Sequence, residues 1–184
     1  MKKNKIIYIF IIIMIITILF LIILKNKKAK NELLEEIIPQ EEISEKQERE
    51  TLVTLYFEDK ESGELSKEVR IIDVRELAND PFKKLVEMLI DGPKSDKLKK
   101  VIPDGTKINN IYIQEDIIYI DLSKEFIENH AGGIKNESNT IYSIANTLAE
   151  LNEVNFIRIL IDGEENKEFK DKQINFLNNF EKNN

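Results

Sequence analysis

The sequence predicts an α+β domain with the element order β-β-α-β-β-α-β, preceded by one membrane-spanning helix. Three observations predict it. An uncharged apolar run lies near the start of the chain, several later segments alternate apolar and polar residues as strands do, and two segments carry apolar residues at helical spacing. A small sheet with two amphipathic helices packed on one face buries these apolar surfaces economically, so we expect that arrangement.

The run Ile6–Leu24 contains 19 residues with no charge, no Gly and no Pro. An α-helix needs roughly 20 apolar residues to cross a bilayer. We therefore interpret residues 1–30 as an N-terminal membrane anchor with a transmembrane helix over 6–24. A cleaved secretory signal is the alternative, but it would have a shorter apolar core and a cleavage site of small residues. The chain has no cysteine that could carry a lipid anchor.

Lysines flank the run on both sides, so charge alone does not decide its orientation. A short tail before a first helix usually stays cytoplasmic, which would place the domain outside. Residues 1–30 carry seven lysines and no acid, which leaves 34 acidic and 20 basic side chains for the rest of the chain. This acidic excess would be repelled by phosphate and argues against nucleic-acid binding. Residues 31–50 hold eight glutamates and are interpreted as an acidic linker.

The folded domain is predicted over residues 51–163. Apolar and polar side chains alternate from Val53 to Phe57, and residues 68–74 form a second strand rich in β-branched residues. The turn sequence Glu61–Glu64 lies between these strands, so they should pair as a hairpin.

The helix that follows has the clearest local signals. Asn79 or Asp80 can cap its first turn, and Pro81 suits its first position. One apolar stripe follows, made of Phe82, Leu85, Val86, Leu89 and Ile90. Gly92 is expected in the left-handed conformation after the last turn, and Pro93 prevents continuation.

Three more strands and a second helix complete the domain. Strands are predicted over 107–113 and 117–122, the latter with Ile118, Ile120 and Leu122 on its core face. The second helix covers about 137–152 and follows Gly132 and Gly133. Its apolar stripe consists of Ile141, Ile144, Ala145, Leu148 and Leu151. The last strand, 154–162, is apolar on both faces, which indicates a central position in the sheet.

Residues 164–184 form a polar C-terminal tail. Its late apolar residues are Ile174, Phe176, Leu177 and Phe180. They either dock on the domain as a short helix or present a peptide to a partner.

No pattern in the chain predicts catalysis, a metal site or a cofactor. Gly-rich phosphate-binding motifs are absent, and His130 is the only histidine, so multi-His metal sites are excluded. We expect His130 to be an exposed or capping residue in a loop, and Asp121, with Ser123 beside it at a strand end, to hydrogen-bond the following turn. The chain is therefore predicted not to be an enzyme.

The domain has one basic cluster, located in the loop after its first helix. It consists of Lys94, Lys97, Lys99 and Lys100. This cluster is the candidate partner-binding site, for an acidic partner or an anionic wall polymer. A solvated loop is the alternative.

An ordered set of segments resembles a known family. These segments are Leu55–Phe57, Arg70, Leu89–Pro93, Ile102–Ile108, Ile120–Phe126, Thr147–Leu148 and Leu160–Gly163. The set is similar to the GerMN domain, the sporulation and spore germination domain of Gram-positive bacteria, over about residues 51–163. The resemblance implies an envelope protein outside the cytoplasmic membrane with no known enzymatic activity. In related sporulation proteins, similar ring-building folds help assemble the complex between mother cell and forespore.

The chain departs from that family in two respects. Some relatives carry two GerMN copies and several are lipoproteins, whereas this chain has one copy and no cysteine. GerMN domains also occur in lipoproteins unconnected with sporulation.

We therefore expect a single-pass membrane protein whose domain lies outside the cytoplasm, including the space between mother cell and forespore. It would act as a non-catalytic assembly or interaction module with envelope or sporulation proteins, and homo-oligomers fit this expectation. The alternative is an envelope ligand-binding or regulatory module for a wall polymer, peptide or small ligand. A hydrolase, the third class, would need a nucleophile–base pair within hydrogen-bond reach.

Overall fold

The computed structural model describes residues 14, 17–22, 49–151 and 156–182. Residues 17–22 are helical. Most of the predicted membrane helix 6–24 and nearly all of the predicted linker lie outside the described residues, so the anchor stays a prediction. Among the described residues, no helix is both long enough and apolar enough to cross a bilayer.

Arg49–Asn184 form one compact unit. Its longer elements are β1 (Glu50–Asp59), β2 (Leu65–Asp73), α2 (Pro81–Asp91), β4 (Ile108–Gln114), β5 (Ile117–Leu122), α4 (Ile134–Ala149) and β6 (Phe156–Ile161). Its shorter elements are the 3-10 turn η2 (Val74–Glu76), β3 (Leu98–Lys99), α3 (Glu125–Glu128) and β7 (Phe180–Glu181). The predicted α+β class is confirmed, and the short elements are additions that the sequence patterns did not predict.

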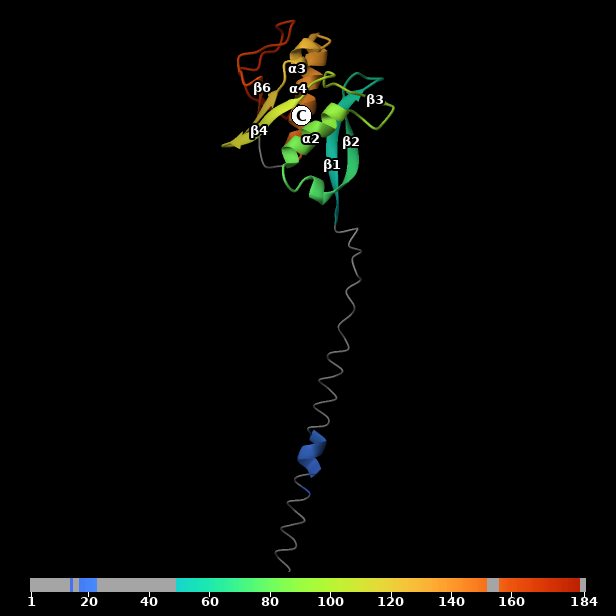
Figure 1. The fold of residues 1–184 in the computed structure, drawn as a ribbon. Helices are drawn as coiled ribbons and strands as arrows, with labels where there is room; N and C mark the ends of the chain where they lie inside the picture. Colours follow the sequence, from blue (N-terminus) through green and yellow to red (C-terminus); the bar gives the residue numbers. More distant parts are fainter. Residues whose placement is uncertain (1–13, 15–16, 23–48, 152–155, 183–184) are drawn as a thin grey trace, which may run out of the picture. The chain divides into compact units, whose positions relative to one another are not determined.

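The strands form two sheets, so our prediction of one small sheet with both helices on one face was wrong. One sheet has the order β2-β1-β3 and the other β4-β5-β6-β7, with β5 and β6 parallel. Helix α4 lies between the two sheets and contacts β1, β6 and β7, while α2 contacts β1, β4 and α4 (Figure 1). The error has a physical cause, because side-chain alternation identifies a strand but does not identify its neighbours.

Side chains of α4 close part of one edge of β1. The Tyr56 N–H donates to the Thr147 hydroxyl at 3.1 Å, and the Ser143 hydroxyl donates to the Tyr56 carbonyl at 2.6 Å. Both hydroxyl residues are buried. Because buried backbone groups need hydrogen-bond partners, α4 takes the place of a neighbouring strand there. Strand β3 pairs with this edge only at Glu58 and Asp59.

Helix α2 begins and ends where its local signals predict. The Asp80 carboxylate accepts a hydrogen bond from the Lys83 N–H at 2.9 Å, and Pro81 occupies the first position. The buried face consists of Phe82, Leu85, Val86, Met88 and Leu89. Gly92 has φ 96° and ψ 178°, so its φ is positive as expected but its ψ is extended rather than left-handed helical. That conformation is essentially restricted to glycine.

The C-terminal segment completes the core. Phe169 and Phe176 are at most 1% exposed, and their rings lie 5.6 and 6.1 Å from the ring of Phe126. Residues 164–182 therefore dock on the domain, which is one of the two alternatives considered above. They do so as irregular chain that ends in β7, and they form no helix.

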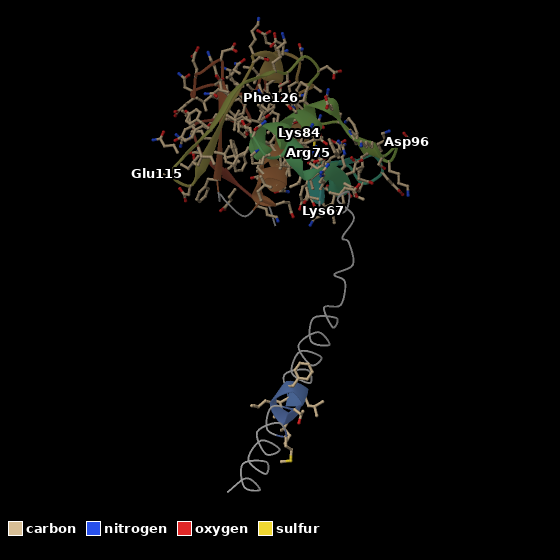
Figure 2. The ribbon with its side chains drawn as sticks, turned by 60° about the horizontal axis from the view of Figure 1, so that its bottom comes forward. Lys67, Arg75, Lys84, Asp96, Glu115 and Phe126 are labelled. Carbon is tan, nitrogen blue, oxygen red and sulfur yellow. The ribbon has the colours of Figure 1, made fainter. Side chains whose placement is uncertain are left out.

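The domain is long in one direction. Glu115 in the β4–β5 turn and Asp96 in the loop after α2 lie at opposite ends of it (Figure 2). The core residues predicted on β5, Ile118, Ile120 and Leu122, are all buried between these ends.

Candidate functional site

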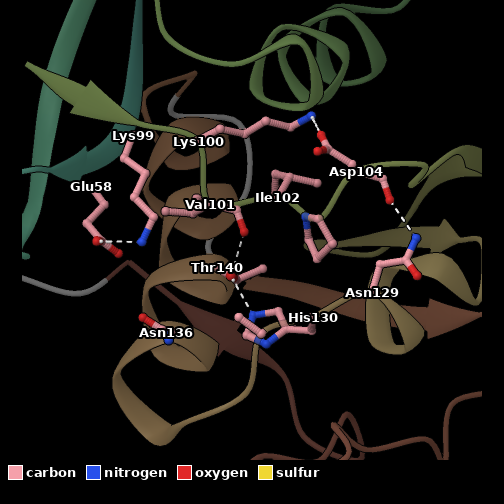
Figure 3. A pocket seen from close by; sticks show the side chains of 12 residues that line it. Glu58, Lys99, Lys100, Val101, Ile102, Asp104, Asn129, His130, Asn136 and Thr140 are labelled. Carbon is pink, nitrogen blue, oxygen red and sulfur yellow. Dashed lines mark hydrogen bonds and ion pairs between the residues drawn. The ribbon is translucent and has the colours of Figure 1, made fainter. Parts of the chain in front are cut away.

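A polar cleft of about 260 Å³ lies where the loop 99–104 approaches α4 (Figure 3). Residues 129–131 and Glu58 at the end of β1 complete its wall. This cleft brings Lys99 and Lys100, two of the predicted partner-binding lysines, into the same wall as His130.

The charged groups of the cleft are already paired. Lys99 Nζ lies 3.1 Å from the Glu58 carboxylate, and Lys100 Nζ lies 2.6 Å from the Asp104 carboxylate (Figure 3). An anionic ligand would have to displace one of these carboxylates. The cleft is therefore a weak candidate for an anion site.

Lys94 and Lys97 lie outside the cleft, in the loop between α2 and β3. The Glu68 carboxylate organises this loop, because it accepts hydrogen bonds from the N–H groups of Lys94 at 3.0 Å and Ser95 at 2.8 Å, and from Arg70 Nε at 2.6 Å. Burial would by itself raise the pKa of Glu68, but these hydrogen bonds outweigh it and the pKa is lowered. The four predicted lysines are thus divided between two places, and their partner-binding role stays a prediction.

His130 is buried, contrary to the expectation of an exposed or capping residue. The Gly132 N–H donates to its Nδ1 at 3.0 Å, and its Nε2 lies 2.9 Å from the Thr140 hydroxyl. Because Nδ1 is an acceptor, the neutral ring carries its proton on Nε2. The ring centroids of Phe169 and His130 lie 4.4 Å apart. Burial lowers the pKa of His130, which favours this neutral form.

The His130–Thr140 pair has the spacing of a nucleophile–base pair but the opposite polarity. The Thr140 hydroxyl donates its proton to the Val101 carbonyl at 2.9 Å, so it must accept from His130 (Figure 3). The other imidazole nitrogen is occupied by the Gly132 N–H. The ring therefore has no free lone pair with which to take the threonine proton. This arrangement ties α4 to the loop 99–104 and activates no nucleophile.

Asp121 and Ser123 are also used by the fold. The Asp121 carboxylate accepts from the Gly163 N–H at 2.9 Å, in the turn after β6 rather than in the turn that follows β5. The Ser123 hydroxyl accepts from the Lys107 N–H at 3.0 Å. Within the part of the chain that the structure describes, no cluster of His, Cys, Asp and Glu side chains suits a metal ion.

Sequence reasoning missed Glu137, a fully buried acid on α4. No hydrogen bond of standard geometry reaches either of its carboxylate oxygens in the described residues. Burial raises the pKa of Glu137 and the nearby Asp171 carboxylate raises it further, while the Ile174 backbone acts in the opposite direction. A single Glu in a polar helical turn gives no local signal of burial.

A groove of about 510 Å³ lies between the β1–β2 hairpin and α4. Tyr56 and Leu65 line one side, and Ile134 and Tyr142 line the other. Ile134 is 54% exposed. The groove has the size of a small-ligand pocket.

The outer face of the β1–β2 hairpin exposes three large apolar side chains. Leu52, Val69 and Ile71 are 67%, 57% and 64% exposed, and Leu52 lies directly opposite Ile71 across the two strands. We call these three residues the hairpin face. Single exposed apolar residues are ordinary, whereas large contiguous apolar patches are typical of interaction sites.

Comparisons with known proteins agree with the sequence resemblance. The family model described as "Germane: Sporulation and spore germination" matches residues 54–167, more than half of the chain. No curated protein gives a significant match. No enzyme family is indicated by the family model or the similar structures.

Three solved structures are similar. A candidate lipoprotein from Clostridium perfringens is 25% identical, with a TM-score of 0.50 over 72% of this chain and 88% of that one. The tandem GerMN domains of the sporulation protein GerM from Bacillus subtilis are 17% identical, with a TM-score of 0.61 over 74% of this chain and 47% of that one. The first of these domains alone is 21% identical, with a TM-score of 0.55 over 65% of this chain and 89% of that one.

This chain thus spans about half of the tandem protein and most of the single domain. The fold, the order of the motifs and the family model lead to one conclusion. The chain belongs to the sporulation and spore germination family named Germane, whose domain is of the GerMN type.

Proposed function

We propose that this protein is a non-catalytic interaction module, held at the outer side of the cytoplasmic membrane by its N-terminal helix, that helps assemble envelope proteins during sporulation or germination. Family membership supports the sporulation part of the proposal. The uncharged run 6–24 and the similarity to a candidate lipoprotein support the membrane part.

One observation supports the interaction role: the side chains of the hairpin face are exposed and apolar, whereas those of the polar cleft are already paired. The hairpin face exposes Leu52, Val69 and Ile71 by more than half each. The polar groups of the cleft, in contrast, are bonded to one another, and the His130–Thr140 pair has the wrong polarity for proton abstraction. The surface that is open to a partner is therefore apolar and lacks reactive groups.

Imaging and protease access test the location. A fluorescent fusion of the full chain should mark the cell envelope and, in sporulating cells, the membranes between mother cell and forespore. External protease should remove the domain from intact protoplasts. Full protection from the protease, or a mature N-terminus near Ala29, would contradict the proposed topology.

Substitutions test the role in a sporulation or germination assay with the deletion strain as reference. Val69→Lys combined with Ile71→Lys should reduce function, because two charged side chains would replace apolar side chains that contact the partner. Leu177→Lys is the matched control, since Leu177 is 58% exposed but lies outside the hairpin. His130→Gln can keep the hydrogen bond to Thr140 and should retain function. Loss of function in a folded, correctly located His130→Gln protein would favour an enzymatic or ligand-sensing role.

The groove between the hairpin and α4 favours a second candidate function. Its volume of about 510 Å³ and its mixed lining suit a peptide or small ligand, so the chain would be an envelope ligand-binding or regulatory module. Ile134→Ala would then impair function as strongly as the hairpin substitutions do, and Ile134 suits this test because it lines the groove and is 54% exposed. Under the leading proposal, Ile134→Ala has little effect on function.

A further inference from the structure

Strand β2, an outer strand of the sheet β2-β1-β3, has one edge that pairs with no strand in the described part of the chain. In an antiparallel sheet, successive residues point their N–H and C=O groups to opposite sides of the strand. The Asp59 N–H bonds to the Glu64 carbonyl towards β2, and the Lys60 N–H bonds to the Lys97 carbonyl on the β3 side. Odd-numbered residues of β1 therefore face β2, and even-numbered residues face the other edge. The bonds of Tyr56 to α4 agree with this assignment.

The register between β1 and β2 shows which residues of β2 direct their backbone N–H and C=O groups towards β1. Val53 lies opposite Arg70 and Leu55 opposite Glu68, so the even-numbered residues of β2 bond to β1. The N–H and C=O groups of Lys67, Val69 and Ile71 consequently point away from the sheet. Among the described strands, only β1 is hydrogen-bonded to β2.

The same residues that expose their backbone also expose apolar side chains. Val69 and Ile71 belong to the hairpin face and are 57% and 64% exposed. A long edge strand with exposed apolar side chains is a template for pairing with another strand, and monomeric proteins normally protect such edges. The free edge of β2 and the exposed hairpin face are therefore best matched by a partner segment in strand conformation.

The sequence of β2 is complementary to itself in an antiparallel arrangement. With a two-fold axis at Arg70, Val69 lies opposite the partner's Ile71, and Lys67 lies opposite the partner's Asp73. The Lys67 side chain is 60% exposed and that of Asp73 is 30% exposed. Each already has a partner within its subunit, since Lys67 Nζ lies 3.9 Å from the Glu150 carboxylate and Asp73 is bonded to Arg75. Pairing across the axis would therefore exchange these surface ion pairs for intersubunit ones. Arg70 meets its own copy at the axis, but each Arg70 is already bonded to Glu68 and to the Gly92 carbonyl within its subunit.

Resting on the proposed function, we propose that the partner of the hairpin face is a second copy of this chain. The two β2 strands pair antiparallel, with Val69 opposite the partner's Ile71, and make one continuous sheet β1-β2-β2-β1. Leu52, Ile71 and the partner's Val69 then lie side by side in a row across that sheet, and the two-fold axis produces a second such row. The pairing is isologous, because both subunits use the same surface.

Disulfide trapping tests the register, because the natural chain has no cysteine. The test uses the full-length chain, either in membranes or purified in mild detergent. Directly opposite residues have Cα atoms about 5.5 Å apart in a hydrogen-bonded antiparallel pair, within the roughly 4.4–6.8 Å range of disulfides. A mixture of Val69→Cys and Ile71→Cys proteins should give a cross-linked dimer on mild oxidation. Val69→Cys alone should not, because two Val69 residues would be offset by two positions.

Ile113→Cys is the matched control. Ile113 is 47% exposed on β4, an outer strand of the other sheet, and should not cross-link. Cross-linking of Ile113→Cys to the same extent as the mixture would show random collision and overturn the proposal. Preferential cross-linking of Val69→Cys alone would overturn the register.

A second pair keeps the proposal testable if the substitutions at 69 and 71 weaken the interface. Lys67→Cys mixed with Asp73→Cys should cross-link. Adding Val69→Lys to both should reduce that product by about tenfold or more, which corresponds to about 1.4 kcal/mol. An unchanged yield with Val69→Lys would contradict the proposal.

The outcome also separates this inference from the proposed function. If no cross-link forms, but the Val69→Lys and Ile71→Lys combination still abolishes function in cells, the hairpin face binds a different protein and only the second-copy proposal fails. If both the cross-link and the cellular function survive those lysines, the proposed function fails as well.

Discussion

The outer strands β2 and β4 each have one edge without a strand partner among the described residues, but they differ in how that edge is protected. Strand β2 pairs with β1 in an unbroken register over nine residues. Strand β4 has a register shift between Ile108 and Asn110 where it pairs with β5. Such a bulge bends a strand and disfavours further pairing.

The side chains reinforce this difference. The exposed residues of β4 include Asn109, Asn110 and Gln114, and its Tyr112 stacks on Tyr119 of β5 with ring centroids 4.9 Å apart. On β2, in contrast, Val69 and Ile71 expose apolar side chains by 57% and 64%. Free backbone groups alone therefore do not make two edges equally available, and in this domain β2 is the more available one.

The largest effect should come from the core that holds both edges in place. Leu148 on α4 and Leu85 on α2 are at most 1% exposed. Leu148→Ala and Leu85→Ala should each lower the free energy of unfolding by about 2–5 kcal/mol, because each leaves a cavity. Denaturant unfolding followed by circular dichroism measures this. A loss below about 1 kcal/mol in both variants would show that the helix faces are misassigned.

A somewhat smaller loss of unfolding free energy is expected from a buried ion pair on β2. Arg70 and Glu68 form a buried pair whose side chains are 6% and 10% exposed. Arg70→Ala should cost about 3 kcal/mol, because it leaves Glu68 without its guanidinium partner. Arg75→Ala is the control, since the Arg75–Asp73 pair lies at the surface and its loss should leave the unfolding midpoint nearly unchanged. Equal effects from both substitutions would contradict the assigned burial.

A pH-dependent effect is expected at Glu137, beneath the segment that supplies β7 to the second sheet. Its pKa is raised from the ordinary value of 4.5 by burial and by Asp171. The folded state therefore holds the proton more tightly than the unfolded state, and stability is lost as pH rises from about 4.5 through the folded-state pKa. Glu137→Gln removes this loss, so the variant should be more stable than the natural chain at pH 7 and no more stable near pH 4.

The difference in unfolding free energy between the natural chain and the Glu137→Gln variant isolates the contribution of Glu137 from those of other titrating groups. His130, whose pKa burial lowers, acts in the opposite direction in both chains, since its contribution is complete above about 6.5 and is lost as pH falls through its folded-state pKa. Thermal unfolding at several pH values measures the difference. A stability difference independent of pH would mean that Glu137 titrates normally.

The smallest effect is expected at the exposed lysines of the loop after α2. Lys94→Ala with Lys97→Ala should leave the unfolding midpoint unchanged, because the loop is held by Glu68 through backbone N–H groups rather than by these side chains. A change in cellular function without a change in stability would support the predicted partner-binding role of the lysines. Unchanged function would favour a solvated loop.

Local signals predicted the elements that local interactions determine. The cap at Asp80, the apolar stripe and the glycine at 92 set the limits of α2, and the alternation in β5 placed its core face correctly. Strand β3 could not be predicted in this way. It has two residues, and its only strand partners are Glu58 and Asp59, which lie some forty positions earlier in the chain.

The environment of His130 and the free edge of β2 depend in the same way on distant residues. Phe169 and Thr140 bury His130, and neither is signalled by the sequence around it. The β-branched residues of 68–74 predicted a strand there, but they did not predict which of its faces would be exposed. They also did not show whether another strand covers that face, because that depends on how the two sheets are arranged.

The hydroxyls of Ser143 and Thr147 have a consequence for the size that an assembly can reach. Together with β3, they occupy positions along the β1 edge that an incoming strand would need. A sheet with one accessible edge can pair with one further strand, and after that pairing it has no accessible edge left. The proposed association through β2 would therefore stop at two copies, and longer arrays would require a different surface of the molecule.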